Sequence, residues 1–284
     1  MSPPIAGAPG DEPGAALRAH LKSVHDAAAG FTESCASACR NAAGLTSYAW
    51  LCDAATPPAD GAVLDLACGS GMLLELCRAH YAPGVALTGV DMSPAELKLA
   101  SARLEGCGVE LHEGLAQTLS FAADRAFDAV LCHWALTLMD PLPAVLEEVA
   151  RVLRPGGVFA AVVDGPAEAA AGYGDICALI DSHVRAVVPD YAELGDPRAR
   201  TGESLAALAG RAFPGAQISV ETQVFTLEDS PARLAEQTAG FFYSSFMLSG
   251  EAHRAMLDDL AGLFARQARP RYEMPVNLLR LTAR

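Results

Sequence analysis

The chain has 284 residues, of which 51% are hydrophobic and 19% charged, with a formal net charge of −14 and a pI near 4.8. This composition can form a sizeable core in one large or two small domains, and its acidity excludes the clustered Lys and Arg that bind nucleic-acid backbones. No apolar run approaches the ~20 residues that cross a bilayer, and the start lacks a signal-peptide pattern. We therefore expect a cytoplasmic monomer or homodimer that binds neither nucleic acid nor membranes.

The N-terminal part differs in composition from the rest. Residues 1–14 are rich in Pro and Gly and predict a disordered tail. Alanine-rich helical segments over 15–58 are expected to form part of a cap. The remaining chain, 59–284, reads as one larger domain with helical insertions at about 165–214 and 228–270.

From residue 62 onward, strand and helix patterns alternate. Apolar strands are predicted at 62–67, 85–90, 109–113, 127–132 and 157–163, and helices at 71–81, from Ser93-Pro94 onward and at 142–153. Ser93 reads as an N-cap, with Glu96 at the capping-box spacing. Such alternation implies a mainly parallel sheet, which binds ligands at the carboxyl ends of its strands.

The pattern changes after Asp164. Helices are predicted at about 167–188 and 203–212, with two more between about 230 and 268. Strand-like runs at 216–227 and 272–284 predict a hairpin at the edge of the sheet, with the intervening helices over its carboxyl end.

The stretch "VLDLACGSGMLLEL", residues 63–76, joins a strand to a helix through Gly69 and Gly71. A dinucleotide fingerprint needs a third glycine where Leu74 stands, so a nicotinamide site is disfavoured. What remains is a bare turn beside a strand acid, Asp65. Asp91 ends the next strand, where a carboxylate can accept hydrogen bonds from both ribose hydroxyls of an adenosine. Taken singly, the glycines fit a plain tight turn and Asp91 fits a helix-entry acid.

Together these motifs resemble the class I S-adenosylmethionine-dependent methyltransferases, in particular those that act on small molecules. The resemblance covers about residues 60–165 and is carried by "VLDLACGSG", "LTGVDMSPAELKLA", "FDAVLCHWALTLM" and "EEVARVLRPGGVFAAV". It implies a Rossmann-like, doubly wound, mainly parallel seven-stranded sheet with helices on both faces and a helical cap over the carboxyl ends of the strands. It also makes 59–284 the methyltransferase domain.

The resemblance assigns cofactor contacts by position. It implies that S-adenosylmethionine, which becomes S-adenosylhomocysteine, is surrounded by Asp65, Ala67, Gly69, Gly71, Asp91, Met92, Cys132 and His133. Asp91 would hold the ribose diol and Met92 would pack on the adenine. One position departs from the pattern: Leu115 stands where the family often has an Asp for the adenine amino group. Adenine recognition is then expected from Ala116 or Gln117.

An enzyme of this family mainly has to align the acceptor with the methyl group and the sulfur, because a sulfonium methyl group is already activated. If the acceptor must lose a proton, the candidates for the base, in order of preference, are His133, Asp164 and Tyr243. A lone histidine after an apolar strand also fits a structural role.

The acceptor is expected to be a bulky, partly apolar small molecule of the kind made in secondary metabolism. The variable regions carry aromatic residues suited to an enclosed pocket: Phe31, Tyr48, Trp50, Tyr173, Tyr191, Phe241, Phe242, Tyr243 and Phe246. Trp134 and the segment 240–248 fit core packing equally well.

No metal is expected. The eight cysteines form no C-x-x-C pair, and Cys35 and Cys39, one helical turn apart, lack residues to complete a tetrahedral set. An S-adenosylmethionine-binding protein of the same fold that assists cyclisation remains the main alternative, while a non-enzymatic interaction module explains the two strand acids less well.

Overall fold

The computed structural model describes residues 14–284 and contains one seven-stranded sheet in the order β3-β2-β1-β4-β5-β7-β6. Its strands are β1 (Ala62–Leu66), β2 (Ala86–Asp91), β3 (Val109–Glu113), β4 (Phe127–His133), β5 (Leu153–Asp164), β6 (Gln217–Glu228) and β7 (Arg271–Thr282). Strands β1 to β5 pair in parallel, whereas β7 is antiparallel to both β5 and β6. The predicted Rossmann-like, mainly parallel fold and its edge hairpin are confirmed.

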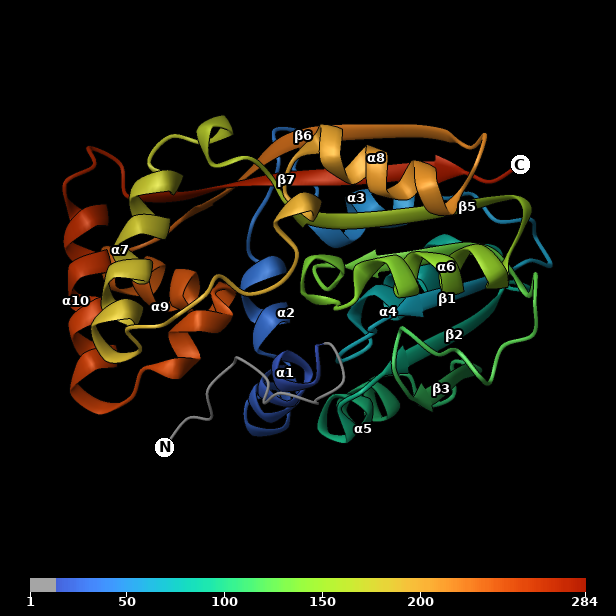
Figure 1. The fold of residues 1–284 in the computed structure, drawn as a ribbon, viewed down its shortest axis with the longest axis horizontal. Coiled ribbons are helices and arrows are strands. Elements are labelled where there is room, and N and C mark those ends of the chain that lie inside the picture. The colour runs from blue at the N-terminus through green and yellow to red at the C-terminus, as the bar shows by residue number, and fades with distance from the viewer. Residues whose placement is uncertain (1–13) are drawn as a thin grey trace.

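Helices cover both faces of the sheet (Figure 1). Helices α6 (Leu142–Val152) and α8 (Gly202–Ala212) pack their apolar sides on one face. Helices α3 (Ser47–Asp53), α4 (Met72–His80) and α5 (Pro94–Arg103) cover the other. The central strands are therefore buried on both sides, which explains their unbroken apolar runs.

The remaining helices gather beyond the carboxyl ends of the parallel strands (Figure 1). They are α1 (Ala15–Ala27), α2 (Phe31–Ala36), α7 (Tyr173–Val187), α9 (Pro231–Phe241) and α10 (Gly250–Ala265), with short 3-10 turns η1 (Leu136–Leu138), η2 (Ala167–Ala169), η3 (Pro197–Ala199) and η4 (Tyr243–Met247). The helix predicted over 167–188 is thus two elements, since the chain turns at Gly172, where φ is 75°. Within residues 14–284, no helix combines the length and apolarity needed to span a membrane.

Residues 1–13 of the predicted tail lie outside the described chain, and Gly14 forms a turn ahead of α1. The division into tail, N-terminal cap helices and a larger domain stays a prediction.

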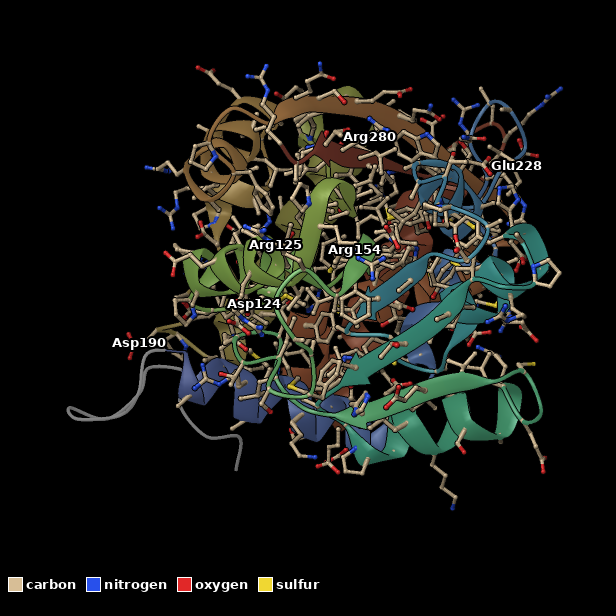
Figure 2. The ribbon with its side chains drawn as sticks, turned by 90° about the vertical axis from the view of Figure 1, so that its right-hand side faces the viewer. Asp124, Arg125, Arg154, Asp190, Glu228 and Arg280 are labelled. Carbon is tan, nitrogen blue, oxygen red and sulfur yellow. The ribbon has the colours of Figure 1, made fainter. Side chains whose placement is uncertain are left out.

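Ion pairs lie at the amino ends of the strands, and Figure 2 labels one member of each of two pairs, Arg154 and Asp124. Arg154 at the start of β5 pairs with Asp128, whose Oδ2 also accepts a hydrogen bond from Ala62 N at 2.8 Å. Arg151 pairs with Asp124 at 2.9 Å. These contacts join β1, β4 and β5 at one end and leave the opposite end for a ligand.

Candidate functional site

A pocket lies over the carboxyl ends of β1, β2 and β4. Its floor comes from the loops after these strands and after β3, and its other walls from α1, α2, α3, α5 and η4. This is the end of a doubly wound sheet at which ligands are expected.

The glycine turn after β1 has one residue that faces the pocket and one that does not. Gly69 lines the pocket with φ at 50°, and a Cβ built on it would meet only Glu96 Oε2, at 3.8 Å. Gly71 has φ at 81°, and a Cβ there would lie 3.1 Å from Ala100 Cβ. Gly69 therefore leaves room for a ligand, while Gly71 lets α5 pack closely. Ala67, which also lines the pocket, adopts an unusual φ of 62° for a residue with a side chain.

Two carboxylates lie next to this turn. Asp65 is 1% exposed, and neither of its side-chain oxygens has a hydrogen-bond partner among the described residues. Burial, and secondly the charge of Asp91, raise the pKa of Asp65 well above its usual range. Asp91 is held differently: Oδ2 accepts from Gly69 N at 2.9 Å and Oδ1 from Ser93 N at 2.8 Å. Burial raises the pKa of Asp91 too, although these two hydrogen bonds oppose the shift.

Glu96 is a third acid in the pocket, and the sequence analysis missed it. Its backbone N donates to Ser93 Oγ at 3.3 Å, as the capping spacing predicts. Its carboxylate, however, leaves the cap: Oε1 accepts from Gly30 N at 2.9 Å and lies 2.8 Å from His25 Nδ1, and Oε2 has no partner in the described chain. The capping box explained Glu96 locally, so nothing in its own segment pointed to the pocket.

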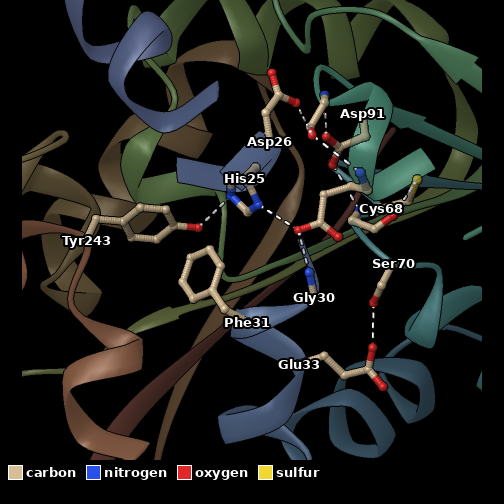
Figure 3. Close-up of polar contacts among 12 residues, drawn as sticks. His25, Asp26, Gly30, Phe31, Glu33, Cys68, Ser70, Asp91 and Tyr243 are labelled. Atoms are coloured by element: carbon tan, nitrogen blue, oxygen red, sulfur yellow. Dashed lines mark hydrogen bonds and ion pairs between the residues drawn. The ribbon is translucent and has the colours of Figure 1, made fainter. Parts of the chain in front are cut away.

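Helices α1 and α2 attach to the loops after β1 and β2 through polar contacts (Figure 3). Ser93 Oγ donates to Asp26 Oδ1 at 2.7 Å, and Ser70 Oγ donates to Glu33 Oε2 at 2.5 Å. Glu33 also pairs with Arg103 at 2.7 Å. These two helices therefore form a roof over the turn, and no local pattern identifies their partners.

The loop after β3 forms another wall. Met92, Leu115, Ala116 and Gln117 all line the pocket. Gln117 Nε2 donates to Asp140 O at 3.0 Å, which leaves its Oε1 as an acceptor.

Residues 63–157 match the family model described as a methyltransferase domain. The chain is 38% identical over 101 residues to a demethylmenaquinone methyltransferase of Symbiobacterium thermophilum, covering 34% of this chain and 40% of the relative. It is 38% identical over 98 residues to a probable phthiotriol/phenolphthiotriol dimycocerosates methyltransferase of Mycobacterium ulcerans, covering 34% and 37%. The chain thus spans well under half the length of these relatives.

A solved structure, YcgJ from Bacillus subtilis, superposes with a TM-score of 0.58 at 17% identity, over 84% of this chain and 98% of that one. This likeness shows the fold. Within this fold, residues 63–157 are the segment that is similar to methyltransferases.

His133 ends β4 and lines the pocket. Its Nε2 lies 2.9 Å from Ser47 Oγ, and its ring stacks on Tyr48 with the centroids 3.6 Å apart. Burial lowers the pKa of His133 well below its usual range, so the imidazole is neutral. Tyr48 was predicted as a pocket aromatic and does line the pocket, whereas Trp50 packs on Phe225 in the core.

Cys132 is not part of the pocket lining, contrary to its predicted cofactor contact. Alternation along β4 turns its side chain to the opposite face of the sheet from His133, where it is completely buried in the core against α6. Gly71 is likewise outside the lining, for the packing reason given above.

Of the other two predicted bases, one lies in the pocket and one does not. Tyr243 on η4 lines the pocket, but Asp164 at the end of β5 does not. The Asp164 carboxylate lies 3.7 Å from Arg200 Nε, and Arg200 directly follows η3. Burial raises the pKa of Asp164, and Arg200 opposes that shift.

Within residues 14–284, no group of three or more His, Cys, Asp or Glu side chains has the arrangement of a metal site. All eight cysteines are free.

Proposed function

We propose that the protein is an S-adenosylmethionine-dependent methyltransferase that acts on a bulky, partly apolar small molecule. The observation that carries this proposal is the pair Asp65 and Asp91 beside the open Gly69 turn. A buried carboxylate with both oxygens unpartnered suits a cationic ligand, and an amide-held carboxylate at the next strand end suits a ribose diol. S-adenosylmethionine offers both groups and supplies an activated methyl group when bound.

The wall formed by the loops after β2 and β3 fits the adenine. Met92 and Leu115 provide apolar contact, and Gln117 Oε1 supplies the acceptor that an Asp supplies elsewhere in the family. The remaining walls are partly apolar, with Leu21, Trp134, Leu138 and Met139 among them. Two relatives are named for demethylmenaquinone and for phthiotriol dimycocerosates, both largely apolar molecules, which supports an apolar acceptor here.

The chain's own contribution to transfer would be to align the acceptor and exclude water. His133, the first of the predicted bases, faces the pocket as an imidazole that would help to align the acceptor. Because burial lowers its pKa, it is a weak base, and we expect His133→Ala to reduce turnover more than cofactor affinity.

Thermal melting tests the cofactor. At ~100 times its dissociation constant, a specific ligand adds about 2.7 kcal/mol of stability, and we expect such a shift with S-adenosylmethionine and S-adenosylhomocysteine but not with NAD. No shift with either sulfur nucleoside would contradict the proposal. Incubation with methyl-labelled cofactor and candidate acceptors separates methyl transfer from assisted cyclisation, since only transfer moves label out of the cofactor.

A further inference from the structure

Three side chains from distant segments form a hydrogen-bonded chain on the pocket wall (Figure 3). Tyr243 Oη lies 2.8 Å from His25 Nε2, and His25 Nδ1 lies 2.8 Å from Glu96 Oε1. All three residues line the pocket, with the side chains of His25 and Glu96 17% and 2% exposed. The function proposed above assigns no role to His25 or Glu96.

The direction of the hydrogen bonds follows from the acceptor at one end. A carboxylate only accepts, so the hydrogen on the His25 ring belongs on Nδ1 and is donated to Glu96. Nε2 of neutral His25 then accepts the Tyr243 hydroxyl hydrogen. This order, a hydroxyl on a histidine that a carboxylate orients, is the arrangement that lets a serine protease move a proton.

The aromatic surroundings hold this chain in place. The ring of Phe31 contacts both His25 and Tyr243, with centroids 5.2 and 5.3 Å away. Phe241, the last residue of α9 and two residues before Tyr243, packs against Trp134 with the ring centroids 5.1 Å apart, so the chain that leads into η4 passes the residue after β4. Tyr243, His133 and Trp134 all line the same pocket.

The charged residues of the pocket limit the charge that the acceptor can carry. Glu33, Asp65, Asp91 and Glu96 line it, and Arg18 is the one Arg or Lys among the described lining residues. Arg18 donates to Asp140 O at 2.9 Å, the same carbonyl that holds Gln117 on the adenine wall. Among the described lining residues, an anionic acceptor would therefore meet four carboxylates and one guanidinium group.

We propose that Tyr243 takes the proton of the methyl acceptor, that His25 and Glu96 are positioning residues for it, and that the acceptor presents an uncharged phenolic or enolic hydroxyl. This inference rests on the function proposed above. The acceptor proton passes to Tyr243 Oη while the tyrosine's own proton passes to His25 Nε2, and the imidazolium faces the Glu96 carboxylate. The new bond joins the acceptor oxygen to the methyl carbon, and the electron pair of the broken carbon–sulfur bond stays with sulfur.

Binding to the full chain saturated with S-adenosylhomocysteine tests the inference without turnover. By calorimetry, we would measure the binding of 2-naphthol and of 2-methoxynaphthalene, in which a methyl group replaces the hydroxyl hydrogen. We expect the naphthol to bind about tenfold more tightly, and Tyr243→Phe to abolish this preference while affinity for S-adenosylhomocysteine stays unchanged. Tyr191→Phe, a buried tyrosine outside the pocket lining, is the matched control and should keep the preference.

Turnover then tests the positioning residues. With S-adenosylmethionine and 2-naphthol, we expect His25→Gln and Glu96→Gln to lower kcat by about 100-fold with KM for the naphthol nearly unchanged, and added imidazole to restore activity to His25→Ala. A structural role alone would lower stability and affinity together and would not respond to imidazole.

Equal affinity for the two naphthalenes, or a preference that persists in Tyr243→Phe, would overturn the inference, as would failure of both to bind the loaded protein. A wild-type chain that does not bind S-adenosylhomocysteine would instead contradict the proposed function itself.

Discussion

Replacing Asp65 with Asn should raise the free energy of unfolding of the ligand-free protein and lower its affinity for the cofactor. Asp65 is buried, and its two oxygens have no hydrogen-bond partner in the described chain. An unsatisfied buried group costs about 1–3 kcal/mol, and a charged one costs more. Because the pKa of folded Asp65 lies well above its usual 3.8, the folded state binds more protons than the unfolded state between the two values. The wild-type free energy of unfolding therefore falls as pH rises through that interval, and Asp65→Asn should lack this fall.

Urea unfolding of both proteins at about pH 5 and about pH 8 measures this difference. We expect Asp65→Asn to gain about 1–3 kcal/mol over the wild type at the higher pH. Asp91→Asn is the matched control, since Asp91 accepts hydrogen bonds from Gly69 N and Ser93 N, and its loss should destabilise the protein.

Calorimetry completes the test. Loss of a charge-assisted hydrogen bond costs about 1.5–3 kcal/mol, so Asp65→Asn should weaken cofactor binding about 10- to 150-fold. If Asp65 binds the amino group, S-adenosylmethionine and S-adenosylhomocysteine lose equally; if it faces the sulfonium, the former loses more. Unchanged affinities, or a variant less stable than wild type at both pH values, would refute this account of Asp65.

Other substitutions separate ligand contacts from scaffold. Gly71→Ala should lower stability by about 2 kcal/mol, because its φ is 81° and the new Cβ would lie 3.1 Å from Ala100 Cβ; thermal melting shows this. Gly69→Ala should fold, with φ at 50° and open space around it, yet bind S-adenosylhomocysteine more weakly in calorimetry. Gln117→Ala should reduce the preference for S-adenosylhomocysteine over its hypoxanthine analogue, and an unchanged ratio would remove Gln117 from the adenine site. Asp91→Ala should lower cofactor affinity at least about tenfold with an unaltered circular dichroism spectrum.

The sheet could be predicted from the sequence because its signals are local. Apolar runs for β1, β2, β4 and β5, the alternating VELHE of β3 and the Ser93-Pro94 start of α5 predict these strands and their helices within a few residues. The same short motifs predicted Asp65, Gly69 and Asp91, which line the floor of the pocket. Side-chain direction was harder: Cys132 and His133 are neighbours, and strand alternation places only His133 in the pocket.

The roof could not be predicted because its contacts are distant in sequence. His25 is 71 residues from Glu96 and 218 from Tyr243, and each residue has an ordinary local explanation. Glu96 occupies a capping position, and Tyr243 follows an apolar helix. Only the placement of α1 over α5 brings these residues together.

This division between floor and roof also separates the cofactor from the acceptor. The segment that matches the methyltransferase domain, 63–157, supplies the floor, including Asp65, Gly69 and Asp91. His25, Glu33, Tyr48 and Tyr243 line the same pocket from outside that segment. A part shared with relatives suits a shared cofactor, whereas acceptor choice requires residues that differ. The acceptor of this protein should therefore be sought in the chemistry of the roof rather than in the names of relatives that match the floor.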